Sequence, residues 1–277
     1  KELRGLGIQP DIIILRTEVS ISQEQKDKIA MFCDVEKNAV FECKDAKILY
    51  EVVNNLHNQH IDDVIAKHFN LELPEADMSE WNNLIDTIKH LDGEVKIALV
   101  GKYVALQDAY ISVNEALKAA GFAYKKKVNI LHIDSAMLNE ENVDEELKDV
   151  DGILVPGGFG SRGVVGKLLA IKYAREHNVP FLGICYGMQL ATIEYCKNVL
   201  GYNDANSTEL DPETSFPIID YLPDQYEGIN MGGTLRLGLY DCTLKEDTKT
   251  YECYQKSAIK ERHRHRYEVN RHYEDKV

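Results

Sequence analysis

The hydrophobic pattern is most regular from residue 94 onward, where short aliphatic runs alternate with longer segments of helical spacing. Short runs of this kind are typical of buried strands, and the longer segments are typical of helices that bury one face. The pattern predicts strands at 95–100, 128–133, 152–155 and 179–184, and helices at 108–120, 140–148, 164–176 and 187–200. This alternation predicts an α/β fold with a doubly wound, mostly parallel sheet that binds ligands at the carboxyl ends of its strands.

The first part of the chain alternates in the same way but has too few strands to make a sheet by itself. It predicts strands at 12–16 and 40–43 and helices at 23–32, 48–58 and 62–69, with Ser22 as an N-cap. A parallel sheet needs neighbouring strands and cover on both faces. We therefore expect residues 1–76 to be the C-terminal part of a larger α/β domain, 77–93 to be a linker helix, and 94–277 to be a second domain.

The end of the chain has a different pattern. After residue 201 the sequence predicts mainly loops, followed by the basic stretch 261–267. The chain starts without Met and enters a buried-type strand almost at once. We expect a piece of a longer protein, and we see no internal repeat.

Composition narrows the functional classes. Of 277 residues, 46 are Asp or Glu and 32 are Lys or Arg, and the resulting net charge of −14 disfavours nucleic acid as a partner. No apolar run is long enough to span a bilayer, so we expect no membrane partner. The six cysteines form no CxxC pair, which favours a reducing, cytoplasmic location.

The sharpest chemical feature is the G-x-C-x-G turn around Cys185, which joins an apolar strand to a helix. This is the arrangement of a nucleophile elbow, in which Gly183 and Gly187 permit the tight turn. We expect the helix N-terminus to lower the pKa of the Cys185 thiol and to make it the most reactive thiol. A buried, inert cysteine is the alternative, and it is the interpretation we give to the other five.

The second feature is the glycine-rich loop 156–160, which directly follows the strand at 152–155. Its bare backbone N–H groups can donate to a developing oxyanion together with the N–H of Tyr186. Alone, such a loop can equally bind phosphate or simply turn the chain. Next to the cysteine elbow, the oxyanion role is the better hypothesis.

Several motifs together resemble the CTP synthase family, which joins an ATP-dependent amidoligase domain of the P-loop type to a class I glutamine amidotransferase domain of flavodoxin-like fold. They are PGGFGSRG at 156–163, GICYGMQ at 183–189, ANSTE at 205–209, GGTLRLG at 232–238 and ERHRHRYEVN at 261–270. GICYGMQ indicates only the amidotransferase superfamily, and the last two motifs make the resemblance specific. Residues 7–11, 28–33 and 44–46 resemble the later part of the synthetase domain.

The resemblance implies roles for individual residues. It makes Cys185 the nucleophile that attacks the glutamine amide, with Glu209 and Arg266 holding the ammonium and carboxylate groups of the substrate. It implies that the glutamine site is lined by Gly158, Tyr186, Gly187, Met188 and Gln189. It also implies nucleotide contacts by Lys28, Lys44, Asp45 and Ala46, although solvated charge would be the preferred interpretation of the two lysines otherwise.

The same resemblance implies UTP, ATP and glutamine as substrates, Mg²⁺ with ATP, GTP as an activator, and a homotetramer. The sequence holds neither a P-loop motif nor the FHPE-type His/Glu motif that ends class I amidotransferases. We expect this stretch alone to be inactive and to hold no metal site. His263 and His265 stand in a basic run that disfavours an imidazolium, so we take neither as a substitute base.

Two other functions stay open. A cysteine hydrolase of the related peptidase branch would share the elbow, but its members typically place His directly after the nucleophile, where this chain has Tyr186. A non-catalytic regulatory or assembly subunit would explain the missing motifs. Residues 232–234 and Arg236 resemble the family's nucleotide-responsive lid, with a plain glycine-rich loop as the alternative.

Overall fold

The computed structural model describes residues 2–222 and 235–277, which form two compact units. The first unit comprises Lys1–Gly93 and Phe122–Lys126, and the second comprises Glu94–Gly121 and Lys127–Val277. Among the described residues, no helix combines the length and the apolar character needed to cross a bilayer.

The first unit is a small α/β arrangement around two parallel strands. Its elements are α1 (Glu2–Gly5), β1 (Ile13–Thr17), α2 (Gln23–Cys33), a 3₁₀ turn (Lys37–Ala39), β2 (Val40–Lys44), α3 (Glu51–His57), α4 (Ile61–His68) and α5 (Ser79–Lys89). The predicted N-cap is confirmed, because Ser22 and Gln25 form a reciprocal capping box at the start of α2. Helix α5 packs on α3, where the indole Nε1 of Trp81 donates to the carbonyl of Tyr50 at 2.9 Å.

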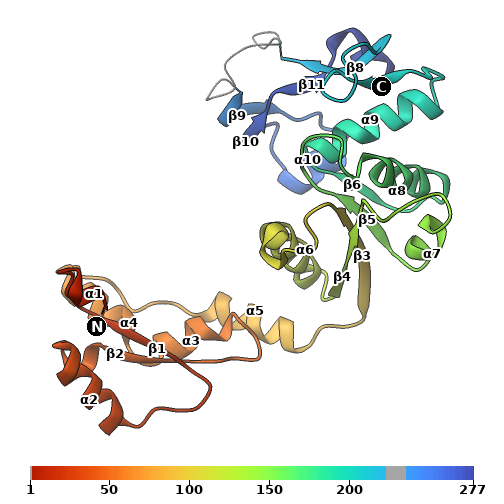
Figure 1. Cartoon of the computed structure of the whole chain (residues 1–277). Coiled ribbons are helices and arrows are strands. Elements are labelled where there is room, and N and C mark those ends of the chain that lie inside the picture. The colour runs from red at the N-terminus through yellow and green to blue at the C-terminus, as the bar shows by residue number, and fades with distance from the viewer. Residues whose placement is uncertain (1, 223–234) are drawn as a thin grey trace. The chain divides into compact units, whose positions relative to one another are not determined.

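The second unit contains the predicted doubly wound sheet, whose four parallel strands run in the order β4-β3-β5-β6 (Figure 1). Its elements are β3 (Glu94–Gly101), a 3₁₀ turn (Gln107–Tyr110), α6 (Ile111–Ala123), β4 (Lys127–Asp134), α7 (Val143–Leu147), β5 (Gly152–Val155), α8 (Val164–Glu176), β6 (Phe181–Gly183) and α9 (Tyr186–Asn198). The strand order reverses beside β3, and this is where open α/β sheets bind their ligands.

Alternate residues of each central strand face opposite sides of this sheet, as β geometry requires. Leu99 and Leu154 pack with Tyr110 and the apolar side of α6. Val100 and Val155 belong to the larger core formed with α7, α8 and α9. Figure 1 shows α6 on one face of the sheet and α7 and α8 on the other.

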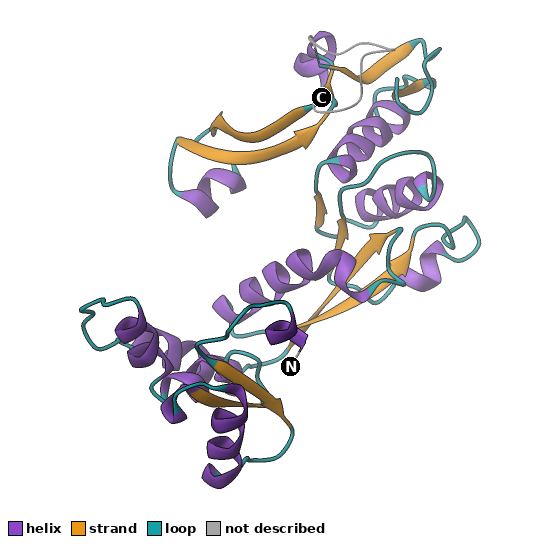
Figure 2. Cartoon of the chain, turned by 60° about the vertical axis from the view of Figure 1, so that its left-hand side comes forward, coloured by secondary structure: helices purple, strands orange, loops and turns teal. Residues whose placement is uncertain are grey.

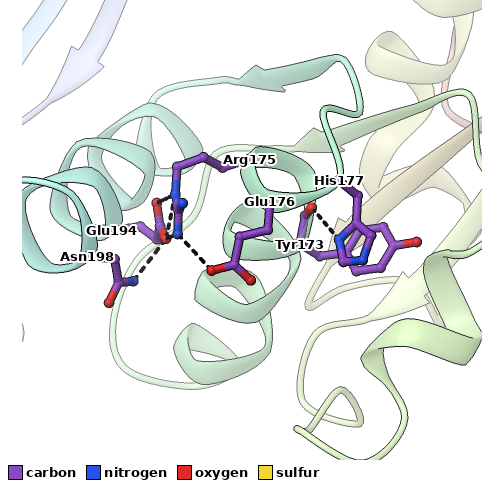
Figure 3. A network of polar contacts seen from close by, with 6 residues as sticks. All are labelled: Tyr173, Arg175, Glu176, His177, Glu194 and Asn198. Carbon is purple, nitrogen blue, oxygen red and sulfur yellow. Dashed lines mark hydrogen bonds and ion pairs between the residues drawn. The ribbon is translucent and has the colours of Figure 1, made fainter.

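An ion pair between a partly exposed arginine and a buried glutamate ties α8 to α9 (Figure 3). The guanidinium of Arg175 donates to both carboxylate oxygens of Glu194, with Nη2 at 2.8 Å from Oε1. Glu194 is buried, and Asn198 also donates to it at 2.9 Å. A buried carboxylate is costly without such partners, so this pair fixes the helix whose N-terminus follows Cys185.

The expectation of a mainly loop-rich end is wrong, because the chain after residue 201 forms two more sheets. The elements are β7 (Ala205–Ser207), β8 (Phe216–Tyr221), β9 (Arg236–Thr243), α10 (Lys249–Tyr254), β10 (Ala258–His265), β11 (Tyr267–Val269) and a 3₁₀ turn (Arg271–Lys276). Strands β9 and β10 form the antiparallel hairpin seen in Figure 2. Strand β11 pairs with β8, which also pairs with β7.

The basic stretch was misjudged because its charges conceal a strand pattern. Along β10, exposed and half-buried residues alternate, so that His263 and His265 share one side and Arg262 and Arg264 the other. Arg266 then joins β10 directly to β11 and is itself buried. The chain thus passes from one sheet to the next at this arginine.

Candidate functional site

Cys185 occupies the predicted elbow between β6 and α9, with φ 51° and ψ −104°. A non-glycine residue in a backbone conformation of this kind is strained, and such strain is concentrated at functional sites. A Cβ on Gly183 would lie 2.6 Å from the backbone of Gly187, and one on Gly187 would lie 2.0 Å from the carbonyl oxygen of Val155. The two glycines are therefore required for the close approach of strand and helix, as predicted.

The pKa of the Cys185 thiol is raised, so the expectation of a lowered pKa is wrong. The largest cause is partial burial of the thiol, and the carboxylate of Glu209 adds to it. The backbone N–H of Tyr186 at the helix N-terminus acts in the opposite direction but does not prevail. A thiol in these surroundings needs a base, or a bound substrate, to become a nucleophile.

A cavity of about 360 Å³ opens beside the Cys185 elbow. It is lined by Gly158, Phe159, Cys185, Gln189, Glu209, Leu235, Arg264, His265, Arg266 and Tyr267. Five of these residues were predicted for the glutamine site: Gly158, Cys185, Gln189, Glu209 and Arg266. They come from the loops after β5, β6 and β7, from α9, and from the junction of β10 with β11, so the fold gathers residues far apart in sequence.

Three other predicted glutamine-site residues are not among those that line this cavity. Tyr186 is buried in the core, and its hydroxyl donates to the carbonyl of Gly160 at 2.9 Å. Gly187 provides the close contact of α9 with β5. Met188 is partly exposed on the first turn of α9.

The glycine-rich loop is held from several sides. The N–H of Gly160 donates to Oε1 of Glu209 at 2.9 Å, and the ammonium of Lys102 donates to the carbonyl of Phe159. Arg162 returns from the loop to donate to the carbonyl of Lys102 at 2.7 Å. The loop is therefore anchored beside the thiol, and its oxyanion role stays a prediction.

Lys167 is a buried cation that the sequence analysis missed. Its side chain is fully buried, and its ammonium has no hydrogen-bond partner among the residues that the structure describes. That group lies 5.0 Å from the ring centroid of Tyr186. Burial lowers the pKa of Lys167 to about 8, and the nearby charges of Lys102 and Arg162 contribute. The helical spacing of 164–176 predicts a helix that contains Lys167, but it does not indicate that this side chain faces the glycine-rich loop.

Other lining residues were also missed, among them Arg264, His265 and Tyr267. They flank Arg266 in sequence, so a strand assignment for 258–265 would have brought them to the same place. The alternation is present in the sequence, but the charges of the basic stretch hide it.

The predicted nucleotide residues of the first unit have no comparable surroundings. Lys28 is exposed on α2 and pairs with Glu24 at 2.7 Å. Lys44 donates to Ser20, and Asp45 pairs with Arg16 at 3.2 Å. Ala46 follows β2 and is half-buried. Their nucleotide role stays a prediction.

The predicted lid is only partly within the described residues. Residues 232–234 lie outside them, whereas Arg236 begins β9. Its guanidinium lies 3.7 Å from the carboxylate of Glu268 and 4.5 Å from the ring centroid of Tyr240. In residues 2–222 and 235–277, no group of three or more His, Cys, Asp or Glu side chains is placed to hold a metal ion.

Comparison with protein families agrees with the geometry of this site. Residues 105–277, more than half of the chain, match the family model described as glutamine amidotransferase class-I. The chain belongs to the class-I glutamine amidotransferase family. Outside this amidotransferase region, residues 1–71 match the model described as CTP synthase N-terminus.

The similar proteins extend the resemblance over the whole chain. CTP synthase from Staphylococcus carnosus is 56% identical over 278 residues, which cover all of this chain and 52% of the relative. CTP synthase from Halalkalibacterium halodurans is 56% identical over 277 residues, with the same coverage. The amidotransferase chain thus spans about half the length of these relatives.

A solved structure is also similar to this amidotransferase chain. The glutaminase domain of Trypanosoma brucei CTPS with bound acivicin is 40% identical, with a TM-score of 0.58 over 65% of this chain and 70% of that one. The likeness supports the class I amidotransferase fold.

Proposed function

We propose that this chain is part of a CTP synthase, in which its second unit releases ammonia from glutamine for the ATP-dependent amination of UTP. The observation that carries the proposal is the elbow cysteine, Cys185, which shares one cavity with Glu209 and Arg266. Similarity to CTP synthases along the whole chain supports it.

In this proposal Arg266 binds the α-carboxylate of glutamine and Glu209 binds its ammonium group, which brings the side-chain amide to Cys185. The thiolate attacks the amide carbon, and the N–H groups of Gly158 and Tyr186 stabilise the oxyanion. The amide nitrogen takes up a proton and leaves as ammonia. Water then cleaves the glutamyl thioester, releasing glutamate and restoring the thiol.

The proton of Cys185 needs an acceptor, and His265 is the histidine among the described residues that line the cavity. Its Nδ1 lies 3.0 Å from the carbonyl oxygen of Tyr267, and its Nε2 lies 2.9 Å from Nδ1 of His263. Because both ring nitrogens are engaged, we do not assign His265 as the base. The resemblance assigns that role to an FHPE-type motif, which these 277 residues do not include.

The proposal for the other half of the reaction rests on the resemblance. ATP phosphorylates the 4-oxygen of UTP, and ammonia displaces the phosphate to give CTP, ADP and inorganic phosphate. Lys28 is proposed to contact the uridine or cytidine nucleotide, and residues 44–46 to lie at the ATP site. Activation by GTP, Mg²⁺ bound with ATP, assembly as a homotetramer and a cytoplasmic location complete the proposal, and no residue is assigned to the metal.

The two alternatives predict different chemistry. A peptidase-branch hydrolase would cleave peptides, but the match to the CTP synthase N-terminal model favours the amidotransferase. A non-catalytic subunit would leave glutamine intact.

The proposal is tested by replacing Cys185 with Ser in the CTP synthase that contains this chain. We expect glutamine-dependent CTP formation to fall by at least about 10³-fold, while ammonia-dependent formation persists, because free ammonia bypasses the thioester. Cys253→Ser, at an exposed cysteine outside the cavity, is the matched control. If Cys185→Ser lowered neither activity, the proposed nucleophile would be wrong.

A further inference from the structure

A line of hydrogen-bonding groups runs along the β9–β10 hairpin toward the cavity. The thiol of Cys242 on β9 lies 3.6 Å from Nε2 of His263 on β10. Nδ1 of His263 lies 2.9 Å from Nε2 of His265, whose Nδ1 lies 3.0 Å from the carbonyl oxygen of Tyr267. Each member contacts the next, and the line ends at the cavity wall.

The direction of these hydrogen bonds is fixed by the last acceptor. A carbonyl oxygen can only accept, so Nδ1 of His265 carries the proton. A neutral imidazole has one N–H, and therefore Nε2 of His265 accepts from Nδ1–H of His263. Neutral His263 then accepts at Nε2 from the thiol of Cys242. Both histidines are thus set as Nδ1–H tautomers.

Charged groups around His263 also oppose a second proton on its ring. Arg236 from β9 faces His263, as does His265, while Glu261 of the same strand and Glu268 of β11 act in the other direction. Burial, followed by Arg236 and His265, lowers the pKa of His263. The lowered pKa favours the neutral form of His263 that these directed hydrogen bonds require.

The last acceptor in this line of hydrogen bonds, the carbonyl of Tyr267, lies one residue from Arg266 of the proposed glutamine clamp. The carbonyl of Tyr267 also accepts from the side-chain amide of Gln189, at 3.0 Å, so it joins β10 to the nucleophile helix α9. Tyr267 directly follows Arg266, and both line the cavity with Cys185. The Tyr267 carbonyl belongs to the peptide that follows Tyr267, so these hydrogen bonds hold the backbone one residue beyond Arg266.

We propose that His263 and His265 are positioning residues for glutamine binding: their directed hydrogen bonds hold the Tyr267 carbonyl, and through it the backbone that carries Arg266. The inference rests on the proposed function for its substrate. Neither histidine touches glutamine in this role, and neither transfers a proton in the reaction.

The first test measures glutamine affinity by calorimetry with the full chain carrying Cys185→Ala, which prevents turnover. His265→Leu removes the donor to Tyr267 and is expected to weaken binding by about tenfold. His265→Asn keeps an N–H donor at the Nδ1 position and should restore affinity to within about threefold of the parent. His263→Leu should have a smaller effect, of about threefold.

Arg262→Leu is the matched control, because Arg262 lies on the same strand but on its exposed side, and we expect its affinity to equal that of the parent. Equal binding by parent and His265→Leu would overturn the inference but leave the proposed function intact. Equal weakening by Leu and Asn would also overturn it, since only shape would then matter. If the parent bound no glutamine, the proposed function would fail, and the positioning role with it.

The second test is independent of glutamine. Nitrogen-15 NMR of the imidazole rings in the full chain should show the Nδ1–H tautomer for both His263 and His265 at pH 7. An Nε2–H tautomer at His265 would overturn the proposed direction of the hydrogen bonds, whatever ligand the protein binds.

Discussion

The residues predicted for glutamine and those predicted for nucleotides have very different surroundings. In the second unit, Cys185, Glu209 and Arg266 line a single cavity. In the first unit, Lys28 and Lys44 are exposed, and they contact Glu24 and Ser20 respectively. The same resemblance supplied both sets, yet the structure gathers only residues of the first set, five of them, around one cavity.

The difference has a physical origin in the number of strands. The main sheet of the second unit has four parallel strands, so loops from neighbouring strand ends meet at one edge and can enclose a cavity. The first unit has two strands and offers two such ends. Residues carried over by resemblance therefore gain structural support only where the sheet around them is wide enough to bring loops together.

The largest effect that tests this difference between the two sets of residues is expected at Arg266. We expect Arg266→Ala to weaken glutamine binding by at least about 30-fold, because a lost charge-assisted clamp on a carboxylate is worth about 2–5 kcal/mol. Lys in its place should rescue only partly, since it lacks the planar fork. Binding by the full chain with Cys185→Ala measures this, and Lys44→Ala in the first unit should leave it unchanged. An Arg266→Ala variant that binds like the parent would remove the clamp from the proposal.

Lys167 gives a second test of the difference between the two units, because it is buried whereas Lys28 and Lys44 in the first unit are exposed. The unfolded chain binds this proton up to pH 10.5, but the folded chain only to about pH 8. Between these values unfolding takes up a proton, so stability rises with pH. Below pH 8 the burial penalty is complete, and the pKa difference corresponds to about 3 kcal/mol.

Lys167→Met should therefore be more stable than the parent by up to about 3 kcal/mol at pH 7, with the difference closing toward pH 10.5. Urea unfolding at several pH values checks this. Lys172→Met, at an exposed position of the same helix, should show no such pH dependence. A Lys167→Met variant less stable at pH 7 would mean that this cation has a partner.

Reactivity at Cys185 offers a smaller effect. Because the pKa of this thiol is raised by burial and by Glu209, an unselective alkylator at pH 7.5 should modify it several-fold more slowly than a small-molecule thiol. A glutamine-mimicking electrophile should instead label Cys185 before the other five cysteines, because the cavity supplies binding. Mass spectrometry after limiting treatment decides, and preferential labelling of Cys196 or Cys242 would place the site elsewhere.

The smallest expected effect is at Lys28 in the first unit. Its ion pair with Glu24 spans one helical turn and is exposed, so Lys28→Ala should change the free energy of unfolding by less than about 0.5 kcal/mol. A clear loss of UTP or CTP binding at unchanged stability would show that Lys28 contacts the nucleotide in the complete protein. The residues predicted for nucleotides would then be supported as well as those predicted for glutamine. Glu24→Ala is the matched control for loss of the pair alone.

Much of the fold was predictable because the signals were local. Residues 152–155 and 164–176 form β5 and α8 with the predicted bounds, since aliphatic runs and helical spacing depend on near neighbours. The elbow at Cys185 was equally predictable, because two glycines and a strand–helix boundary suffice to define it. The helix expected at 140–148 is only Val143–Leu147, a reminder that ends of elements are less well determined.

The electrostatics of the site were not predictable in the same way. The expectation of a lowered pKa for Cys185 was based on the helix N-terminus alone. The pKa is raised instead, because the thiol is partly buried and lies near Glu209, which is distant in sequence. Lys167 likewise comes close to Lys102, 65 residues earlier in the sequence, only in the tertiary fold. Desolvation and Coulomb interactions depend on distances across the chain, which a local pattern does not contain.

By itself, the sequence determined the doubly wound sheet, the cysteine elbow and the family resemblance, because each is carried by adjacent residues and their spacing. Only the tertiary structure decided that the stretch 258–265 is a strand, and that its junction with β11 brings Arg266, His265 and the Tyr267 carbonyl to the cavity. Strand pairing with β9 supplies the backbone partners that a charged, alternating segment needs. Those partners lie about twenty residues away, beyond the reach of a local pattern.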